Sequence, residues 1–431
     1  MGGQGTLAPP VPSIVKSAAK LFWRRRALPA VVSLQLSPGN MRKIITVLLQ
    51  AVSFMFMSHS AHAQYTWSRV RDDTGAGHQF SYTAISSNGE TLLVAGIDGV
   101  FDTLGDQYSR VVLFKSMDAG VTWSELESGL PEHRGMGYFQ LSAVQMIDSV
   151  HYVAIGDSGT FIRSNDGGKH WTHGKLNPLY NAIDVNFSDP STGIAIAYGT
   201  PNVFITHDSG LSWKPITMWQ GLWPQSGHSY GGSKFKVMTY YAGPFYSTTD
   251  DFSTFDSVWI FNDSGEHGLA KCNWSESGDL VASGVHWVTG SLADALIATS
   301  SDGGRHWSTV NGIAGALFGG VQAVSQLDRD VVFAFGQSNH KILVSHDHGV
   351  TWAADTMIFP DFGQAAELLG LDAYGLTVTP SGVVVGLCVA PLFRGGPGFI
   401  IRGVKGVKRV DAYERVVYST SIYPNPGSDR V

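Results

Sequence analysis

An eight-residue motif recurs six times along this 431-residue chain and constrains its fold more than any other feature. The clearest copy, at residues 300–307, reads Ser-Ser-Asp-Gly-Gly-Arg-His-Trp. The Asp at its third position can accept hydrogen bonds from backbone N–H groups just downstream, and the glycines supply the positive φ of a tight turn. The Trp at its eighth position leaves the turn with a large apolar surface to bury. We therefore predict a hairpin turn with an aromatic anchor at each copy.

The spacing of the copies predicts how these turns are arranged. Successive Asp residues lie 48, 42, 42, 52 and 45 residues apart, and a period in this range is typical of the four-stranded blades of a β-propeller. The copy at residues 248–255 is degenerate, with Phe252 and Phe255 in place of the Gly and the Trp. The predicted structural residues of the turns are Asp118, Trp123, Asp166, Trp171, Asp208, Trp213, Asp250, Asp302, Trp307, Asp347 and Trp352.

The two ends of the repeat region indicate how the ring closes. After the last motif, residues 375–379, 383–389 and 398–402 predict three strands without a motif of their own. Residues 65–70 resemble the end of a motif followed by its strand. Pairing this strand with the last three would remove the open sheet edges. We predict an all-β, seven-bladed propeller of four-stranded antiparallel blades over residues 64–405, with six blades as the alternative.

The motif resembles the Asp-box, or BNR repeat, of the sialidase-like superfamily. The short blades with Asp-Gly-Gly-x-x-Trp look closest to those of photosystem-assembly-factor-like propellers, and they also resemble sortilin-like propellers. The resemblance covers roughly residues 65–405. It implies the propeller fold but little about activity, because these families share a fold and differ in chemistry.

The N-terminal region has the pattern of an export signal. Met41 is followed by a basic pair, an apolar run over residues 44–57 and the small-residue site Ala61-His62-Ala63, so we predict a signal peptide at residues 41–63. A membrane anchor is the alternative, but 14 apolar residues fall short of the ~20 that span a bilayer. We interpret residues 1–40 as an over-extended or disordered N-terminus, and expect no membrane span after cleavage.

The C-terminal region resembles a secretion signal of another kind. Residues 421–427 resemble the first strand of the C-terminal sorting domain of the type IX secretion system, so we interpret residues 406–431 as a linker and the start of a truncated sorting domain. We expect a secreted or outer-surface protein, exported through the periplasm, with the type IX machinery as a candidate partner.

The net charge of the chain narrows the classes of partner. The formal charge of −6 argues against nucleic acid or an anionic membrane surface as the main partner.

The two cysteines, Cys272 and Cys388, fall in different repeats. We predict buried free thiols, with one blade-to-blade disulfide as the alternative. The motif carboxylates are expected to cap their own turns, so no metal and no cofactor is predicted.

Catalytic residues of the resembled enzymes do not transfer to this chain. A sialidase would require three arginines around the substrate carboxylate, a Tyr–Glu nucleophile pair, an Asp and an Arg-Ile-Pro motif. Arg69 and Arg71 lie near the first strand without that motif, and the Tyr240-Tyr241 pair is a weak nucleophile candidate. We therefore expect a non-catalytic protein, with a glycoside hydrolase of exo-sialidase type as the alternative.

The loops that leave each motif strand predict a binding surface on the face opposite the motifs. The loops at 131–138, 177–180 and 218–230 combine Trp and Tyr with Gln, His and Arg, which suits stacking on a sugar or gripping a peptide. The alternative is that Trp219 and Trp223 plug the channel or pack between blades. We predict binding of a glycan or protein partner, and the predicted ligand-binding residues are Arg134, Tyr138, Tyr180, Trp219, Trp223, His228 and Tyr230.

Overall fold

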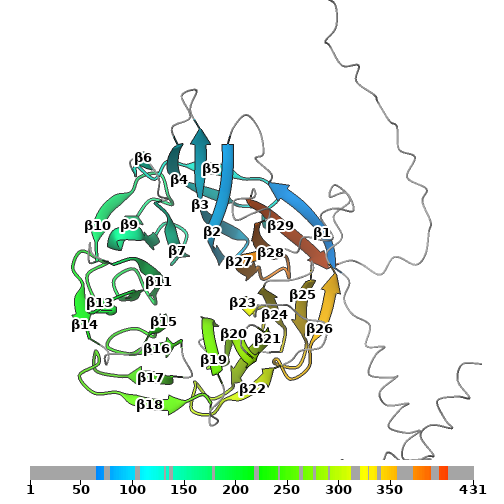
Figure 1. The fold of residues 1–431 in the computed structure, drawn as a ribbon. Helices are drawn as coiled ribbons and strands as arrows, with labels where there is room; N and C mark the ends of the chain where they lie inside the picture. Colours follow the sequence, from blue (N-terminus) through cyan, green and yellow to red (C-terminus); the bar gives the residue numbers. More distant parts are fainter. Residues whose placement is uncertain are drawn as a thin grey trace, which may run out of the picture. The chain divides into compact units, whose positions relative to one another are not determined.

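The computed structural model describes residues between 65 and 405, and its strands form seven antiparallel sheets arranged as the blades of a ring (Figure 1). The predicted all-β, seven-bladed propeller is confirmed, and the six-bladed alternative is wrong. The described ranges are 65–71, 78–101, 107–130, 133–134, 139–176, 180–217, 223–240, 243–261, 266–274, 278–289, 292–311, 321–328, 330–336, 341–356, 372–389 and 398–405.

The seventh blade closes the ring with strands from both ends of the chain. Thr66 lies opposite Val404 and Arg69 opposite Ile401 in an antiparallel ladder. The Tyr65 N–H also donates to Asp355 Oδ2 of blade 6 at 3.0 Å, so the first strand is linked to the preceding blade as well. The predicted closure is therefore confirmed. From the axis outward this blade consists of β27 (Asp372–Val378), β28 (Val384–Val389), β29 (Gly398–Lys405) and β1 (Tyr65–Arg71).

Blades 1 to 3 each run outward from the axis in chain order. Blade 1 is β2 (His78–Asn88), β3 (Thr91–Phe101), β4 (Gln107–Ser116) and β5 (Ser124–Leu126), with the short β6 (His133–Arg134) also paired to β4. Blade 2 is β7 (Leu141–Met146), β8 (Tyr152–Gly156), β9 (Thr160–Ser164) and β10 (Thr172–Lys175), with the 3-10 turn η1 (Asp157–Gly159) between β8 and β9. Blade 3 is β11 (Ala182–Phe187), β12 (Gly193–Ala197), β13 (Val203–Thr206) and β14 (Lys214–Ile216).

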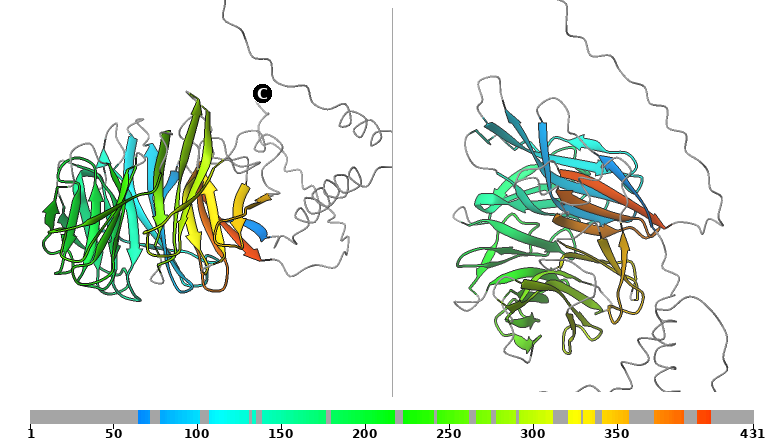
Figure 2. Two further views of the ribbon diagram at one scale, coloured as in Figure 1. Left: turned by 90° about the horizontal axis from the view of Figure 1, so that it is seen from below. Right: turned by 45° about the vertical axis from the view of Figure 1, so that its right-hand side comes forward.

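Blades 4 to 6 follow the same order, and the β20–β21 hairpin projects past the neighbouring strands (Figure 2). Blade 4 is β15 (Pro224–Ser229), β16 (Phe235–Thr239), β17 (Pro244–Thr248) and β18 (Asp256–Trp259). Blade 5 is β19 (Glu266–Asn273), β20 (Leu280–Thr289), β21 (Leu292–Ser300) and β22 (Ser308–Asn311). Blade 6 is β23 (Val321–Gln326), β24 (Val332–Gly336), β25 (Lys341–Ser345) and β26 (Ala353–Thr356).

The core lies between the blades. Every residue of β12 is buried, as expected for a strand covered on both faces. One apolar cluster joins Val153 and Phe161 of blade 2 to Ala195 and Phe204 of blade 3. Because such a cluster needs both blades, each blade is stabilised by its neighbours rather than by itself.

The six motif turns, which we call boxes, share the hydrogen bonds made by the Asp and by the Ser or Thr two residues before it. In the first box Asp118 Oδ1 accepts the Thr122 N–H at 2.8 Å. The Ser116 hydroxyl accepts the Gly120 N–H at 2.8 Å, and the Trp123 indole donates to the Gly120 carbonyl at 3.2 Å. Among the described residues the Trp213 indole N–H has no partner, whereas the other four box Trp residues donate theirs as in the first box. The degenerate box keeps the Asp contact, with the Thr254 N–H 2.9 Å from Asp250 Oδ1. The carboxylates therefore belong to their own turns.

Each box also ties together two turns of its blade. The residue after the Asp donates its N–H to the turn between the first and second strands, as in the 3.0 Å bond from Ala119 N to Glu90 O. The same bond runs from Asp251 N to Ser233 O in blade 4 and from Gly303 N to Gly278 O in blade 5. We call the side of the ring that carries these turns the box face, and the opposite side the loop face.

The two cysteines lie within the described residues, whereas the predicted signals at the chain ends do not. Cys272 and Cys388 are free thiols, the first half-buried and the second buried, so the disulfide alternative is wrong. The predicted signal peptide and sorting motif lie outside the described residues. Within the part of the chain that the structure describes, no helix is long and apolar enough to cross a membrane.

Candidate functional site

The predicted ligand-binding residues fall into three groups in the structure. Tyr180 and Trp223 lie in described connections of the loop face, as predicted. Tyr138 and Trp219 lie outside the described residues. Arg134 belongs to β6, and its backbone pairs with Tyr108 of β4. The Arg134 side chain is not among those described. His228 and Tyr230 belong to a different part of the molecule, described below.

Tyr180 and Tyr198 form the first part of a surface on blade 3. The half-buried Tyr180 ring covers Gly199, where a Cβ would lie 2.3 Å from the ring and φ is +99°, so only glycine fits. Asn181 links this region to the η1 turn of blade 2. Its carbonyl accepts the Tyr198 N–H at 2.9 Å, and its side chain accepts the Ser158 N–H at 3.0 Å. The Tyr198 side chain remains 45% exposed on this fixed backbone.

Trp223 lies on the loop face of blade 4, immediately before β15. Its side chain is 53% exposed. Its carbonyl accepts the Tyr240 N–H at 2.8 Å. The Tyr240 ring in turn meets Trp287 of β20 edge to face, with ring centres 6.2 Å apart. We call Tyr180, Tyr198, Trp223, Tyr240 and Trp287 the aromatic arc.

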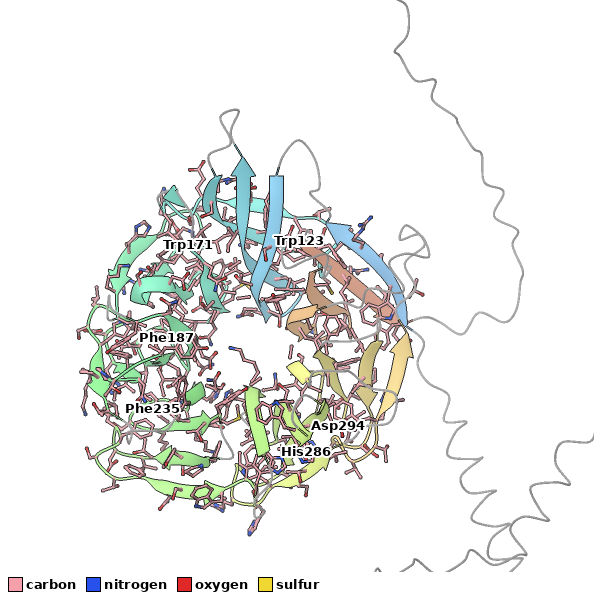
Figure 3. The ribbon with its side chains drawn as sticks, in the orientation of Figure 1. Trp123, Trp171, Phe187, Phe235, His286 and Asp294 are labelled. Carbon is pink, nitrogen blue, oxygen red and sulfur yellow. The ribbon has the colours of Figure 1, made fainter. Side chains whose placement is uncertain are left out.

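A histidine stack supports the arc on the long hairpin of blade 5. The His267 ring lies between Phe261 and His286, with ring centres 4.2 Å and 4.7 Å away. His267, His286 and Asp294 are opposite one another on β19, β20 and β21, and Figure 3 labels the last two. Among the described residues no group of three His, Cys, Asp or Glu side chains is placed to hold a metal ion. Because the His267 and Phe261 rings are buried, the stack belongs to the packing of this hairpin.

The predicted placement of His228 and Tyr230 on the loop face is not what the structure shows. Both lie at the other end of β15, which runs from the loop face at Pro224 to the box face at Ser229. His228 stacks on Trp274 with ring centres 5.4 Å apart, and burial lowers its pKa to about 4. Tyr230 lines a pocket beside the box of blade 5. The prediction treated residues 218–230 as one loop, although their second half is a strand.

The central channel contains an ion pair instead of a catalytic constellation. Six of the seven inner strands line a hollow of about 170 Å³. Lys271 of blade 5 reaches Asp184 of blade 3, with Nζ 3.4 Å from Oδ1. The other Asp184 oxygen accepts the Gly227 N–H of blade 4 at 3.0 Å. This pair therefore links three inner strands, and both Asp184 carboxylate oxygens accept hydrogen bonds.

The described arginines do not converge as a sialidase would require. Arg110 pairs with Asp98 and Glu125 inside blade 1. Arg163 and Arg402 donate to carbonyls in neighbouring boxes, at 2.8 Å in each case. Nothing in the described part of the chain favours the exo-sialidase alternative, and the aromatic arc is a surface suited to binding.

Comparisons with known proteins agree with the fold and point to one named group. No protein-family model matches the chain. It is 24% identical over 261 residues to the photosystem II assembly lipoprotein Ycf48 of Synechococcus sp. (strain CC9902), covering 57% of this chain and 70% of that protein. The structure of YCF48 from Cyanidioschyzon merolae has a TM-score of 0.51 at 14% identity, covering 78% of this chain and 98% of that one.

Two further structures show how far each likeness extends. A structure of YCF48 bound to D1 peptide is 20% identical over 61% of this chain and 92% of its own, with a TM-score of 0.35. A streptogramin B lyase has a TM-score of 0.55 at 9% identity, covering 80% of this chain and all of its own, so the fold alone does not select a function. Together with the sequence relative, the comparisons support a photosystem-assembly-factor-like propeller.

Proposed function

We propose that this chain is a non-catalytic propeller that binds a protein partner through the aromatic arc on its loop face. The observation that carries the proposal is the pair of large aromatic side chains, Trp223 and Tyr198, that are 53% and 45% exposed. Exposed Trp and Tyr on a fixed backbone are the side chains that contribute most to binding energy at protein interfaces.

A protein ligand is favoured over a glycan by what the sequence relative is called. Aromatic rings stack on sugars as well as on peptide side chains, so the arc alone fits both classes. The relative is named for the assembly of photosystem II, and YCF48 has been solved with a D1 peptide. We carry over only the class of ligand, a peptide segment of another protein.

Arrays of immobilised peptides and of glycans, read with the purified full chain, test this proposal. We expect binding to peptides, and an affinity loss of about tenfold or more in Trp223→Ala and Tyr198→Ala, because a central aromatic at an interface is commonly worth ~2 kcal/mol. The control is Leu211→Ala, whose side chain is 73% exposed on the box face. Binding to glycans alone would refute the ligand class, and equal losses in all three variants would refute the site.

Export is the second part of the proposal. The supporting observation is the sequence of residues 41–63, with its basic, apolar and small-residue parts in order. We propose a secreted or outer-surface protein, with the type IX machinery as the route suggested by residues 421–427. N-terminal sequencing of the exported protein is expected to start at Gln64. A start at another residue, or retention of the protein in the cytoplasm, would contradict this.

A further inference from the structure

Three seams between blades on the box face are crossed by a cation from the third strand of a blade. Lys115 Nζ of β4 donates to the Gly167 carbonyl in the next box at 3.2 Å. Arg163 of β9 and Arg402 of β29 reach the Ser209 and Ala119 carbonyls in the same way, each at 2.8 Å. All three cations come from the third strand of their blade, so their long side chains cover the outer part of the seam.

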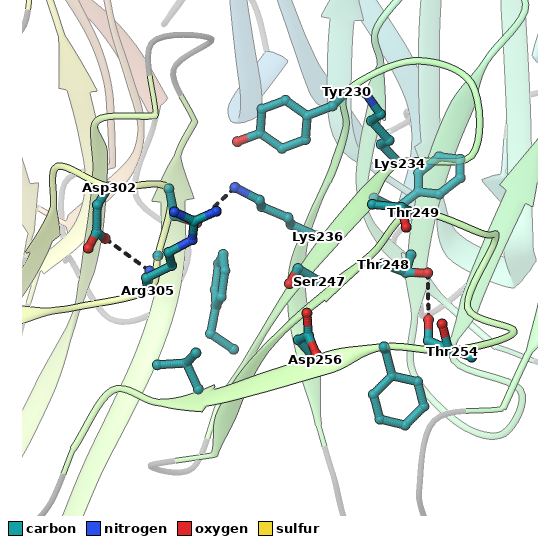
Figure 4. Close-up of a pocket in the computed structure, with 16 residues that line it drawn as sticks. Tyr230, Lys234, Lys236, Ser247, Thr248, Thr249, Thr254, Asp256, Asp302 and Arg305 are labelled. Atoms are coloured by element: carbon teal, nitrogen blue, oxygen red, sulfur yellow. Dashed lines mark hydrogen bonds between the residues drawn. The ribbon is translucent and has the colours of Figure 1, made fainter.

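The seam between blades 4 and 5 is built differently. The residue of β17 just before its box is Ser247, which is too short to cross. The cation comes instead from Lys236, opposite Ser247 on β16, whose Nζ donates to the Gly303 carbonyl at 2.8 Å. Because β16 is nearer the axis than β17, the outer part of this seam stays open. A pocket of about 740 Å³ occupies it (Figure 4).

The floor of this seam pocket carries a Lys amine with one acceptor and a Tyr hydroxyl with none among the described residues. Lys236 Nζ lies 4.6 Å from the centre of the Tyr230 ring, and Gly303 O is its single hydrogen-bond acceptor among the described residues. The Tyr230 hydroxyl is buried and has no partner in the described part of the chain. A buried hydroxyl without a partner is costly, so a ligand that accepts its hydrogen bond would be favoured.

The rim of the seam pocket adds positive charge. The exposed Arg305 guanidinium forms no ion pair with a described carboxylate, and it points toward Lys236 and Tyr230 (Figure 4). Lys234 is a third cation on the lining. Asp302 is already engaged by its own box, where its Oδ1 accepts the Arg305 and His306 N–H groups at 3.0 Å and 2.9 Å. That leaves Asp256 as the opposing carboxylate on the lining.

These groups match a carboxylate ligand. An Arg fork, a Lys amine and a Tyr hydroxyl are donors that a single carboxylate can accept together. A phosphate dianion would suit them less well, because the Asp256 side chain on the same wall would repel its second charge. The Phe245 and Phe255 rings complete the lining with apolar surface for the stem of an acidic side chain.

The outer wall of the seam pocket indicates that the carboxylate belongs to a peptide. This wall is β18, the edge strand of its sheet, whose Asp256 and Val258 line the pocket. An extended segment that pairs with an edge strand presents alternate side chains to the same side. We propose that the pocket between blades 4 and 5 binds an acidic side chain of an extended peptide from a partner protein, with Arg305, Lys236 and Tyr230 as its donors. This site does not involve the aromatic arc, so either proposal can fail alone.

Calorimetric titration of the full chain with two matched peptides tests the inference. The probe is an acetylated and amidated hexapeptide of alternating Val and Glu, and its control carries Gln in place of Glu. We expect the Glu peptide to bind at least about tenfold more tightly, and Arg305→Gln and Tyr230→Phe each to remove most of that difference. The matched control is Lys169→Gln, which changes the exposed cation at the same box position in blade 2.

The outcomes separate a built site from general attraction of charge. Equal binding of the two peptides, no binding of either, or an equal loss in Lys169→Gln and Arg305→Gln would overturn the inference. Glutarate binding as tightly as the Glu peptide would overturn its peptide part, because the edge strand would then contribute nothing. Tyr230→Phe removes one hydroxyl without a described partner, so an unchanged unfolding midpoint together with lost binding supports the site.

Discussion

The two faces of the propeller use the same strands for different purposes. On the box face six turns repeat one hydrogen-bond set, and each Asp is occupied within its own turn, as Asp118 is by Thr122. On the loop face the connections share no motif, and Trp223 and Tyr198 extend from a fixed backbone. Repeated positions in this chain therefore maintain the fold, and we propose that positions that break the repeat serve binding.

The seam between blades 4 and 5 places a second candidate site on the other face. It belongs to the box face, where the short Ser247 stands before the box and Lys236 crosses the seam nearer the axis, beside an open pocket.

The largest effect that tests the comparison is expected at the fifth position of a box. Gly210 has φ +78°, and a Cβ there would lie 2.4 Å from the Phe161 ring of the preceding blade. Gly210→Ala should therefore lower the free energy of unfolding by about 3 kcal/mol, from backbone strain and overpacking together. Gly232→Ala is the control, because it has φ +56° but nothing within 4 Å, and should cost about 1 kcal/mol. Urea unfolding measures both, and equal losses would contradict the close approach.

The next effect concerns the pH dependence of the seam between blades 4 and 5. Burial lowers the pKa of His228 from its ordinary 6.5 to about 4, so between these values the unfolded chain binds a proton that the folded chain does not. The contribution of His228 to the free energy of unfolding is therefore fully present above pH 6.5. It decreases as the pH drops toward 4, by about 3 kcal/mol in total. His228→Phe keeps a ring against Trp274 and should flatten this part of the curve. An unchanged slope in chemical unfolding from pH 7 to pH 4.5 would show that His228 is not buried.

The smallest effect is expected from the exposed box carboxylates. Hydrogen bonds from the Thr122 hydroxyl and N–H lower the pKa of Asp118 to about 2. Its stabilising contribution is present above its ordinary pKa of 3.8 and is lost as the pH falls through about 2. Because the group is exposed, we expect less than about 1 kcal/mol. Unfolding curves of Asp118→Asn should be flatter than wild type between pH 4 and pH 2, and a parallel pair of curves would contradict the turn geometry.

The ring could be predicted from the sequence because its signal is local and repeated. The Asp and Trp of each box constrain one turn each, and the strand at Tyr65–Arg71 could be assigned to the last blade because the blade otherwise lacked a fourth strand. These inferences depend on turn chemistry and edge pairing, which act over a few residues.

The site was predicted less completely because it depends on contacts between blades. β15 reads Pro-Gln-Ser-Gly-His-Ser, without the β-branched residues that favour strands, and its burial between blades overrides that composition. His228 and Tyr230 were therefore assigned to the wrong face. The seam pocket was missed because Lys236, Arg305 and Tyr230 come from different blades or strands, and no local pattern in the sequence joins them.

The central claim is that stability belongs to the repeated turns and binding to the positions that break the repeat. The most direct test measures peptide affinity and the free energy of unfolding for Trp223→Ala and Gly210→Ala side by side, at a temperature where both are folded. We predict that Trp223→Ala loses about tenfold in affinity while its free energy of unfolding changes by less than about 0.5 kcal/mol. Gly210→Ala should keep its affinity and lose about 3 kcal/mol of its free energy of unfolding. The claim is contradicted if Trp223→Ala destabilises the fold as much as Gly210→Ala does, or leaves affinity unchanged.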